Sequence, residues 1–265
     1  MSRYENVVVA AALTLLSTAS MSQPLAFVAC PVFRNVPEMR GCWLTKYHDE
    51  WYYLGSPGGV NAKGSLPPQL KHRALVEGAV KPDAPRVCGG LVMEPVKVSA
   101  LEPLDPLCNT VLGAEGFHIP AYNATTGIPD TSTMTPPPQA PYTDQDIVVD
   151  FYFDTTFLGI PSQLAIQRAA AYALASDAAE VTVRTFRGAT RLSDGKLMLE
   201  REVIAQERAR KIVDSLVDLG VAPERVHAAE HPSVQEGGPL NAPDLRSAHI
   251  VVAGFPEHPI SRMIR

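Results

Sequence analysis

The sequence predicts an α+β protein in two parts, a β-rich N-terminal module and a C-terminal domain in which strands and helices alternate. Three observations support this prediction. All four cysteines lie in the N-terminal half, six of the 24 prolines lie between Pro120 and Pro141, and amphipathic helical spacing occurs only after this proline-rich segment. The contents of 46% hydrophobic and 19% charged residues are typical of a globular chain rather than a disordered one.

The N-terminus carries a short apolar run that is typical of a secretory signal peptide. The run extends from Val7 to Leu16 and is followed by small residues, which places the expected cleavage after Ala19. An uncleaved membrane anchor reaching toward Ala29 is the alternative, but polar residues and a proline interrupt the run. We assign residues 1–26 to the signal peptide or anchor and expect export to the periplasm or cell envelope, with membrane association only through an uncleaved anchor.

Export favours disulfides over free thiols, and the number of cysteines is even. A zinc site is the competing interpretation, but the chain has no Cys-x-x-Cys pair, and His48 and His72 stand at no ligand-like spacing. Three pairings are possible. The pairing of nearest neighbours in the sequence, which we take as the expectation, joins Cys30 to Cys42 and Cys88 to Cys108.

Residues 27–118 read as a small β-rich module. Strand-like segments at 51–54, 74–80 and 95–99 are separated by glycine and proline, and no amphipathic helix of ten residues appears. Such a pattern predicts a small barrel or sandwich, by analogy an OB-like one. Five aromatic residues could form a sugar- or peptide-stacking platform, but cross-strand and core packing is the commoner role; they are Trp43, Tyr47, Trp51, Tyr52 and Tyr53.

Residues 119–145 form a linker rich in proline and threonine, and a domain over 146–255 follows, with a tail at 256–265. Within this domain, the pattern of apolar residues and turn signals predicts an alternation of strands and helices. The expected elements are strand 147–153, helix 161–175, strand 180–186, helix 200–219, strand 225–230 and strand 248–253.

The second predicted helix carries one apolar stripe and one arginine at its margin. The stripe recurs at helical spacing and consists of Ala205, Ala209, Ile212, Leu216 and Leu219. Arg208 lies about 60° from the centre of the stripe, at the edge of the buried face. Gly220 is placed to end the helix, and Pro223 follows as a stop signal.

This helix resembles the motif helix of the OmpA-like peptidoglycan-binding domains, the C-terminal type found in OmpA and MotB. The family pattern N-x-x-L-S-x-x-R-A-x-x-V-x-x-x-L is matched at its apolar, Arg and Ala positions by Ile204, Arg208, Ala209, Ile212 and Leu216. The segment from Val149 to Asp154 resembles the opening F-x-F-D strand of that domain. The resemblance covers about 40% of the chain and implies two helices packed on one mixed sheet.

The resemblance also implies a binding site for the diaminopimelate of the peptidoglycan stem peptide. In the family, the motif arginine binds the ligand carboxylate and a loop aspartate binds the ammonium group. Arg208 fills the first role. Ser193 stands at the family distance of the aspartate, so we assign the second role to the adjacent Asp194. Two plainer roles stay open: Asp194 as a turn residue before glycine, and Arg208 as the partner of Glu200 or Asp150.

Two polar positions depart from the family motif, Arg201 for Asn and Ala205 for Ser, and Ser247 to His249 replace a family Asn-Arg-Arg. No catalytic motif, metal-binding pattern or cofactor-binding loop is found, and the net charge of -5 without a basic cluster argues against a nucleic-acid partner. The sequence therefore predicts a non-enzymatic envelope protein that binds peptidoglycan, with an N-terminal module that contacts another envelope protein. The alternative is a domain that has lost peptidoglycan binding and serves as a protein–protein scaffold.

Overall fold

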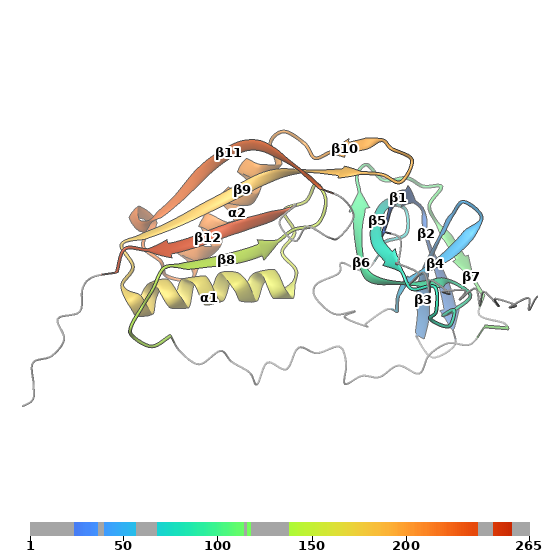
Figure 1. Cartoon of the computed structure of the whole chain (residues 1–265), viewed down its shortest axis with the longest axis horizontal. Coiled ribbons are helices and arrows are strands. Elements are labelled where there is room, and N and C mark those ends of the chain that lie inside the picture. Colours follow the sequence, from blue (N-terminus) through green and yellow to red (C-terminus); the bar gives the residue numbers. More distant parts are fainter. Residues whose placement is uncertain are drawn as a thin grey trace, which may run out of the picture.

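The computed structural model describes residues 24–36, 40–56, 68–113, 116–117, 138–237 and 246–255. Figure 1 shows a β-barrel beside a domain of one sheet and two helices, so the predicted α+β class and its β-rich module are confirmed. Most of the expected signal peptide, residues 119–137 of the expected linker and the tail lie outside the described residues. None of the helices in the described ranges is long and apolar enough to cross a membrane.

Seven strands form the N-terminal module: β1 (Pro24–Ala29), β2 (Pro31–Val36), β3 (Arg40–Tyr47), β4 (Glu50–Gly55), β5 (Arg73–Val80), β6 (Leu91–Leu101) and β7 (Thr110–Leu112). Their order is β1-β5-β6-β4-β3-β2-β7. Because β1 and β2 are the two halves of one strand bent at Cys30, their pairing with β5 and with β3 closes the sheet into a barrel. The parallel pairing of β4 with β6 completes the OB-like topology that the sequence suggested.

The aromatic residues of the module pack rather than form an open platform. Tyr52 belongs to the barrel core with Phe27 and Val76, and Trp43 and Tyr47 pack against that core. On the outer side of the barrel, Trp51 and Tyr53 pack against a second small core around the disulfide of Cys42 and Cys88. The packing role expected for the aromatic cluster is confirmed.

Both disulfides form, but the expected pairing of sequence neighbours is wrong. Cys30 is bonded to Cys108 and Cys42 to Cys88, with Cα separations of 4.9 and 6.4 Å. The register of β2 on β3 places Cys42 opposite Arg34, four residues beyond Cys30. Four residues of strand span about 13 Å, which is too far for a disulfide. The barrel instead brings both partners in from loops that are distant in sequence.

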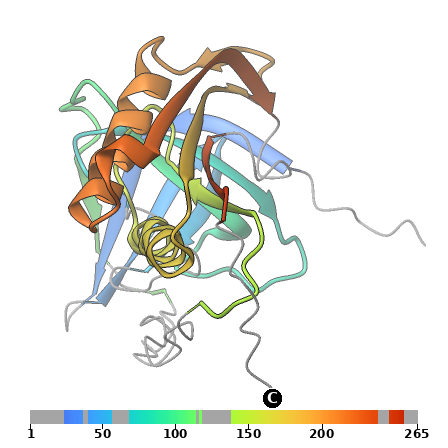
Figure 2. The same ribbon diagram turned by 90° about the vertical axis from the view of Figure 1, so that its left-hand side faces the viewer.

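The C-terminal domain contains β8 (Gln145–Asp150), α1 (Ile160–Ser176), β9 (Glu180–Arg191), β10 (Leu197–Leu199), α2 (Ile204–Asp218), η2 (Pro223–Arg225), β11 (Val226–Gly237) and β12 (Ser247–Ala253). The sheet order is β10-β9-β12-β8, and β11 pairs with β9 in parallel, so the sheet is mixed. Both helices share one core with the sheet, and in Figure 2 they lie on the same side of it.

Local sequence explains where the helices begin and end. Pro161 occupies the first turn of α1, where its missing N–H costs nothing, and Asp177 closes that helix in a left-handed conformation. In α2, the buried residues include Ile212 and Leu216 from the predicted stripe. Gly220 follows with φ of 99°, as its predicted role as a terminator requires.

Strand β9 is longer than the sequence predicted. It continues past residue 186 to Arg191 and turns back through β10, which pairs with it in an antiparallel hairpin. The tip of this hairpin reaches the barrel, because the N–H of Ser193 donates to the carbonyl oxygen of Ala26 at 2.7 Å. The segment that replaces the binding loop of the family is therefore part of the contact between the two domains.

Candidate functional site

Arg208 lies inside the domain rather than at its edge. The exposed fraction of this residue is 0%, which corrects the expected position at the margin of the buried face. Its Nε donates to the carbonyl oxygen of Thr155 at 3.1 Å, and its Nη2 donates to that of Tyr152 at 2.9 Å. The guanidinium carbon also lies 4.9 Å from the centre of the Phe151 ring. These contacts come from the segment after β8, which carries the F-x-F-D pattern.

The fork of Arg208 is occupied by an internal carboxylate. Glu200, which is also 0% exposed, accepts from Nη1 at 2.8 Å through Oε2 and from Nη2 at 2.6 Å through Oε1. The same two oxygens accept the backbone N–H groups of Asp154 at 2.7 Å and Gly188 at 2.6 Å. The open alternative in which Arg208 pairs with Glu200 is thus the observed arrangement, and it is bidentate.

A second ion pair, between Asp154 and Arg201, adjoins the buried pair of Arg208 and Glu200. The carboxylate of Asp154 accepts the N–H of Arg201 at 2.9 Å and its Nε at 3.2 Å. Arg201 also pairs with Glu207 at 3.0 Å, and these acidic partners raise the pKa of its guanidinium. Arg201 stands where the family carries Asn, so this departure from the motif supplies a residue that fastens the segment before α2 to the segment after β8.

Asp194 lies at the tip of the β9–β10 hairpin. Its carboxylate accepts the backbone N–H of Lys196 at 3.0 Å and lies 3.1 Å from the ammonium group of the same residue, and these contacts lower its pKa. Gly195 follows with φ of 87°, as expected for a turn. The tip is three residues beyond Arg191, whereas Gly188 borders the Arg208 pair, so at least about 10 Å of strand separates the two sites. The structure does not bring Asp194 and Arg208 together.

Arg246, which directly precedes β12, forms an ion pair between the two domains. Nη2 of Arg246 donates to both oxygens of Glu77 on β5 at 2.5 Å, and the exposed fractions are 4% and 0%. Thr190 on β9 donates to the same carboxylate at 2.9 Å. The backbone N–H of Phe153 donates to the hydroxyl of Ser99 on β6 at 3.0 Å. The two domains therefore share a buried polar interface.

Lys97 adds a perturbed cation to this interface. Its ammonium group lies 5.8 Å from the centre of the Tyr152 ring. Burial lowers its pKa from 10.5 to about 8, and the positive charge of Arg246 adds to the effect. Sequence analysis missed both Lys97 and Glu77. Glu77 is a single acidic residue inside the apolar strand 74–80, which indicates a buried partner, but that partner, Arg246, lies 169 residues away in the sequence.

No family model and no curated protein sequence matches the chain. Among solved structures, the OmpA-like domain of FopA1 from Francisella tularensis matches 43% of this chain and 76% of its own, with 16% identity and a TM-score of 0.31. The periplasmic domain of MotB from Helicobacter pylori matches 42% and 81%, with 16% identity and a TM-score of 0.33. The chain is similar to OmpA-like domains. At these identities the likeness concerns the fold alone.

Proposed function

We propose that this protein is an exported, non-enzymatic component of the cell envelope whose OmpA-like domain serves as a protein–protein interaction scaffold and does not bind peptidoglycan. One observation carries the proposal. Glu200 fills the guanidinium fork of Arg208 at a site with no exposed surface. The group that the family motif would offer to a ligand carboxylate is already bound to a carboxylate of the chain itself.

A ligand carboxylate would have to displace Glu200, and the energetics oppose this exchange. Glu200 would lose two charge-assisted bonds from Arg208 and two backbone N–H groups. A buried carboxylate without its partners costs several kcal/mol, and the incoming ligand would recover only the arginine bonds. The internal ligand therefore holds the site closed.

The hairpin supports the scaffold in a second way. Ser193 and Ala26 exchange two hydrogen bonds, since the N–H of Ala26 also donates to the hydroxyl of Ser193 at 3.0 Å. Asp194, the residue assigned to a ligand ammonium group, instead pairs with Lys196 in the same turn. A loop that holds the barrel in place is suited to presenting a composite surface to other envelope proteins.

Peptidoglycan binding is the second candidate, and the motif match of α2 around Arg208 favours it. The two candidates differ in sedimentation with purified sacculi. We expect the wild-type chain to stay in the supernatant while a peptidoglycan-binding OmpA-like domain, as the positive control, sediments. Sedimentation of the wild type that is lost in a folded Arg208→Lys variant would overturn the scaffold proposal, because lysine cannot form the bidentate contact.

A further inference from the structure

A cleft of about 590 Å³ lies where the barrel meets the β9–β10 hairpin. The barrel contributes β1, the end of β6 and the loop after it, and the hairpin contributes its tip and β10. The cleft continues the interface that Ser193 and Ala26 form between the two domains. Its walls therefore come from both domains, and it exists only when they are docked.

One wall of this cleft is the outer edge of β1, which pairs with no further strand among the described residues. Strand β1 is the first strand in the sheet order and pairs along its length with β5. Both backbone groups of Ala26 point away from β5, since they bond to Ser193. Residues two apart in a strand share their orientation, so the N–H and C=O of Val28 also point outward. Val28 lines the cleft.

Ser193 therefore bonds to β1 at one position of an added strand, and Val28 is the next position with the same orientation. The hairpin turns at Asp194 and Gly195, directly after the residue that bonds to Ala26. We propose that the cleft binds an extended peptide segment of a partner protein, which adds to the edge of β1 at Val28. This inference rests on the proposed scaffold function and assigns its binding site.

The side chains of the cleft fit such a segment. Leu101, Leu104 and Met198 supply apolar surface for every second side chain of an extended peptide, and Leu104 is 61% exposed. The charged residues on the walls have both signs, and they are Arg73, Lys196, Glu102, Asp105 and Asp194. A polymer of one charge would meet like charges here, whereas a peptide backbone with apolar side chains would not.

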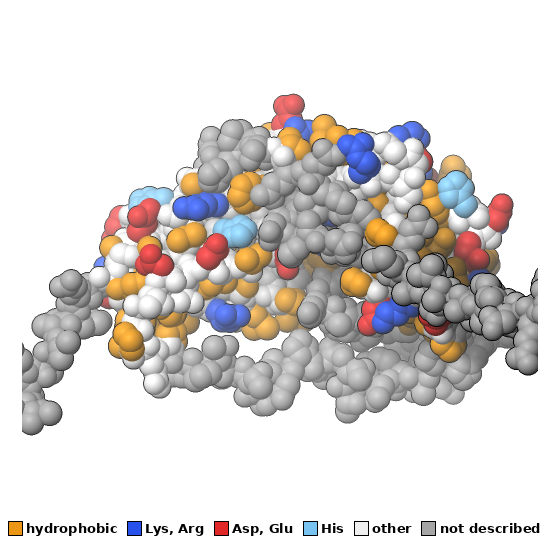
Figure 3. All heavy atoms as spheres, viewed as in Figure 1, with side chains coloured by type: hydrophobic (Ala, Val, Ile, Leu, Met, Phe, Trp, Pro, Cys, Tyr) orange, Lys and Arg blue, Asp and Glu red, His pale blue; other side chains and the backbone are white. Residues whose placement is uncertain are grey.

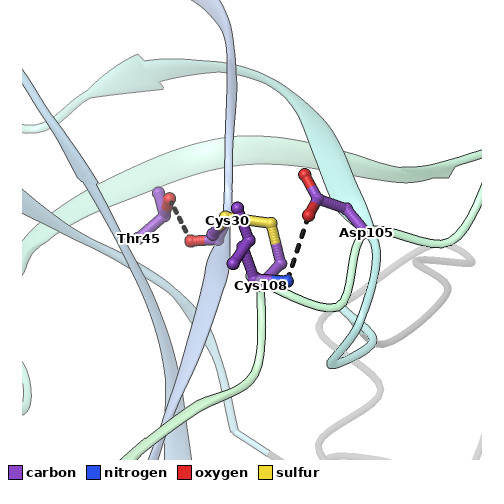
Figure 4. Close-up of a disulfide and its surroundings, with 5 residues drawn as sticks. Cys30, Thr45, Asp105 and Cys108 are labelled. Carbon is purple, nitrogen blue, oxygen red and sulfur yellow. Dashed lines mark hydrogen bonds between the residues drawn. A yellow bond between two sulfur atoms is a disulfide. The ribbon is translucent and has the colours of Figure 1, made fainter.

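The wall opposite the hairpin is held in place before any ligand arrives. Cys108 joins the loop after β6 to Cys30 at the end of β1 (Figure 4). In the same loop, the N–H of Cys108 donates to the carbonyl oxygen of Asp105 at 3.0 Å, and the N–H of Asp105 donates to that of Lys71 at 2.8 Å. A preorganised wall reduces the entropy lost on binding a flexible peptide.

Selection of phage-displayed random heptapeptides on the oxidised full chain tests the proposal. We expect enriched peptides in which apolar residues alternate, and calorimetry with a synthetic enriched peptide measures their affinity. Val28→Pro removes the outward N–H but is tolerated at a sheet edge, and it should weaken binding about tenfold. Leu174→Glu, which introduces a charge at an exposed position of α1 outside the cleft, is the control, with affinity unchanged.

Leu104→Glu places a charge in the cleft at an exposed position and should also weaken peptide binding about tenfold. Because an exposed substitution leaves the fold intact, this variant tests the proposal even if Val28→Pro does not fold. Failure to enrich any peptide, or equal affinity for wild type and both variants, would overturn the proposal. The sacculus experiment is independent. If the protein sediments with sacculi and also binds the peptide at Val28, the scaffold function is refuted and this site is kept. If it neither sediments nor binds a peptide, the scaffold function is kept and this site is refuted.

Discussion

Glu200 receives four hydrogen bonds inside the domain, two from Arg208 and two from backbone N–H groups. Such a carboxylate has no capacity left for another partner, and Arg208 has no nitrogen turned to solvent. Replacing the guanidinium would leave a buried charge without compensation. The pair therefore contributes to stability mainly through the penalty that follows when one member is lost.

We predict that Arg208→Ala lowers the free energy of unfolding by about 3–5 kcal/mol, because Glu200 stays buried without a counter-ion. The double variant Glu200→Gln with Arg208→Met should lose less than the sum of the single changes. Lys211→Ala, on the exposed face of the same helix, is the control and should change stability by less than about 0.5 kcal/mol. Urea denaturation of the wild type, Arg208→Ala, the double variant, its two single changes and the control measures these differences, and a wild-type value for Arg208→Ala would refute the structural role.

Lys97 gives a prediction on pH. Its pKa is lowered from 10.5 to about 8, so the unfolded chain binds more protons between these values and stability rises with pH through this window. Lys97→Met should remove this rise and stabilise the protein at pH 7, by at most about 3 kcal/mol. Thermal melts of both proteins from pH 6.5 to 10.5 measure the difference. Parallel stability curves would show that Lys97 titrates normally.

At the scale of elements, helix α2 and its end could be predicted because periodicity and Gly220 are local signals. The length of β9 could not, since its last residues pair with β10 and the turn between the two strands bonds to Ala26 on another domain. The predicted position of Arg208 at the edge of the buried face rested only on its angle from the apolar stripe of the helix. Its burial depends on the segment after β8, which covers it from 53 residues away in the sequence. The predicted disulfide pairing was wrong for the same reason: the pairing depends on contacts between residues distant in the sequence, which form when the barrel closes.

At the scale of the whole molecule, the two domains are joined by the pair of Glu77 and Arg246, which is buried at their interface. On the face seen in Figure 3, basic, acidic and apolar side chains of the described residues are interspersed, without a patch of one charge.

The disulfides close segments of 78 and 46 residues, and the chain-entropy model gives each about 4 kcal/mol of stabilisation. Most of that stabilisation belongs to the barrel.

Reduction should therefore affect both domains. If the barrel unfolds, Arg246 loses its carboxylate partner, so the unfolding temperature of the cysteine-free domain should fall as well. Glu77→Gln should weaken this coupling, and calorimetric scans of oxidised and reduced protein measure it. An unfolding transition of the C-terminal domain that is identical before and after reduction would mean that the interface contributes nothing to stability.

The most direct test of the closed site is a titration of the wild-type protein with a diaminopimelate-containing muropeptide, followed through the NMR signal of the Arg208 side-chain Nε–H group. Because Glu200 occupies the guanidinium, we predict no change in this signal up to millimolar muropeptide, while Arg210 serves as an exposed reference on the same helix. A saturable shift of the Arg208 signal would contradict the account, since it would mean that the ligand reaches the arginine and displaces Glu200.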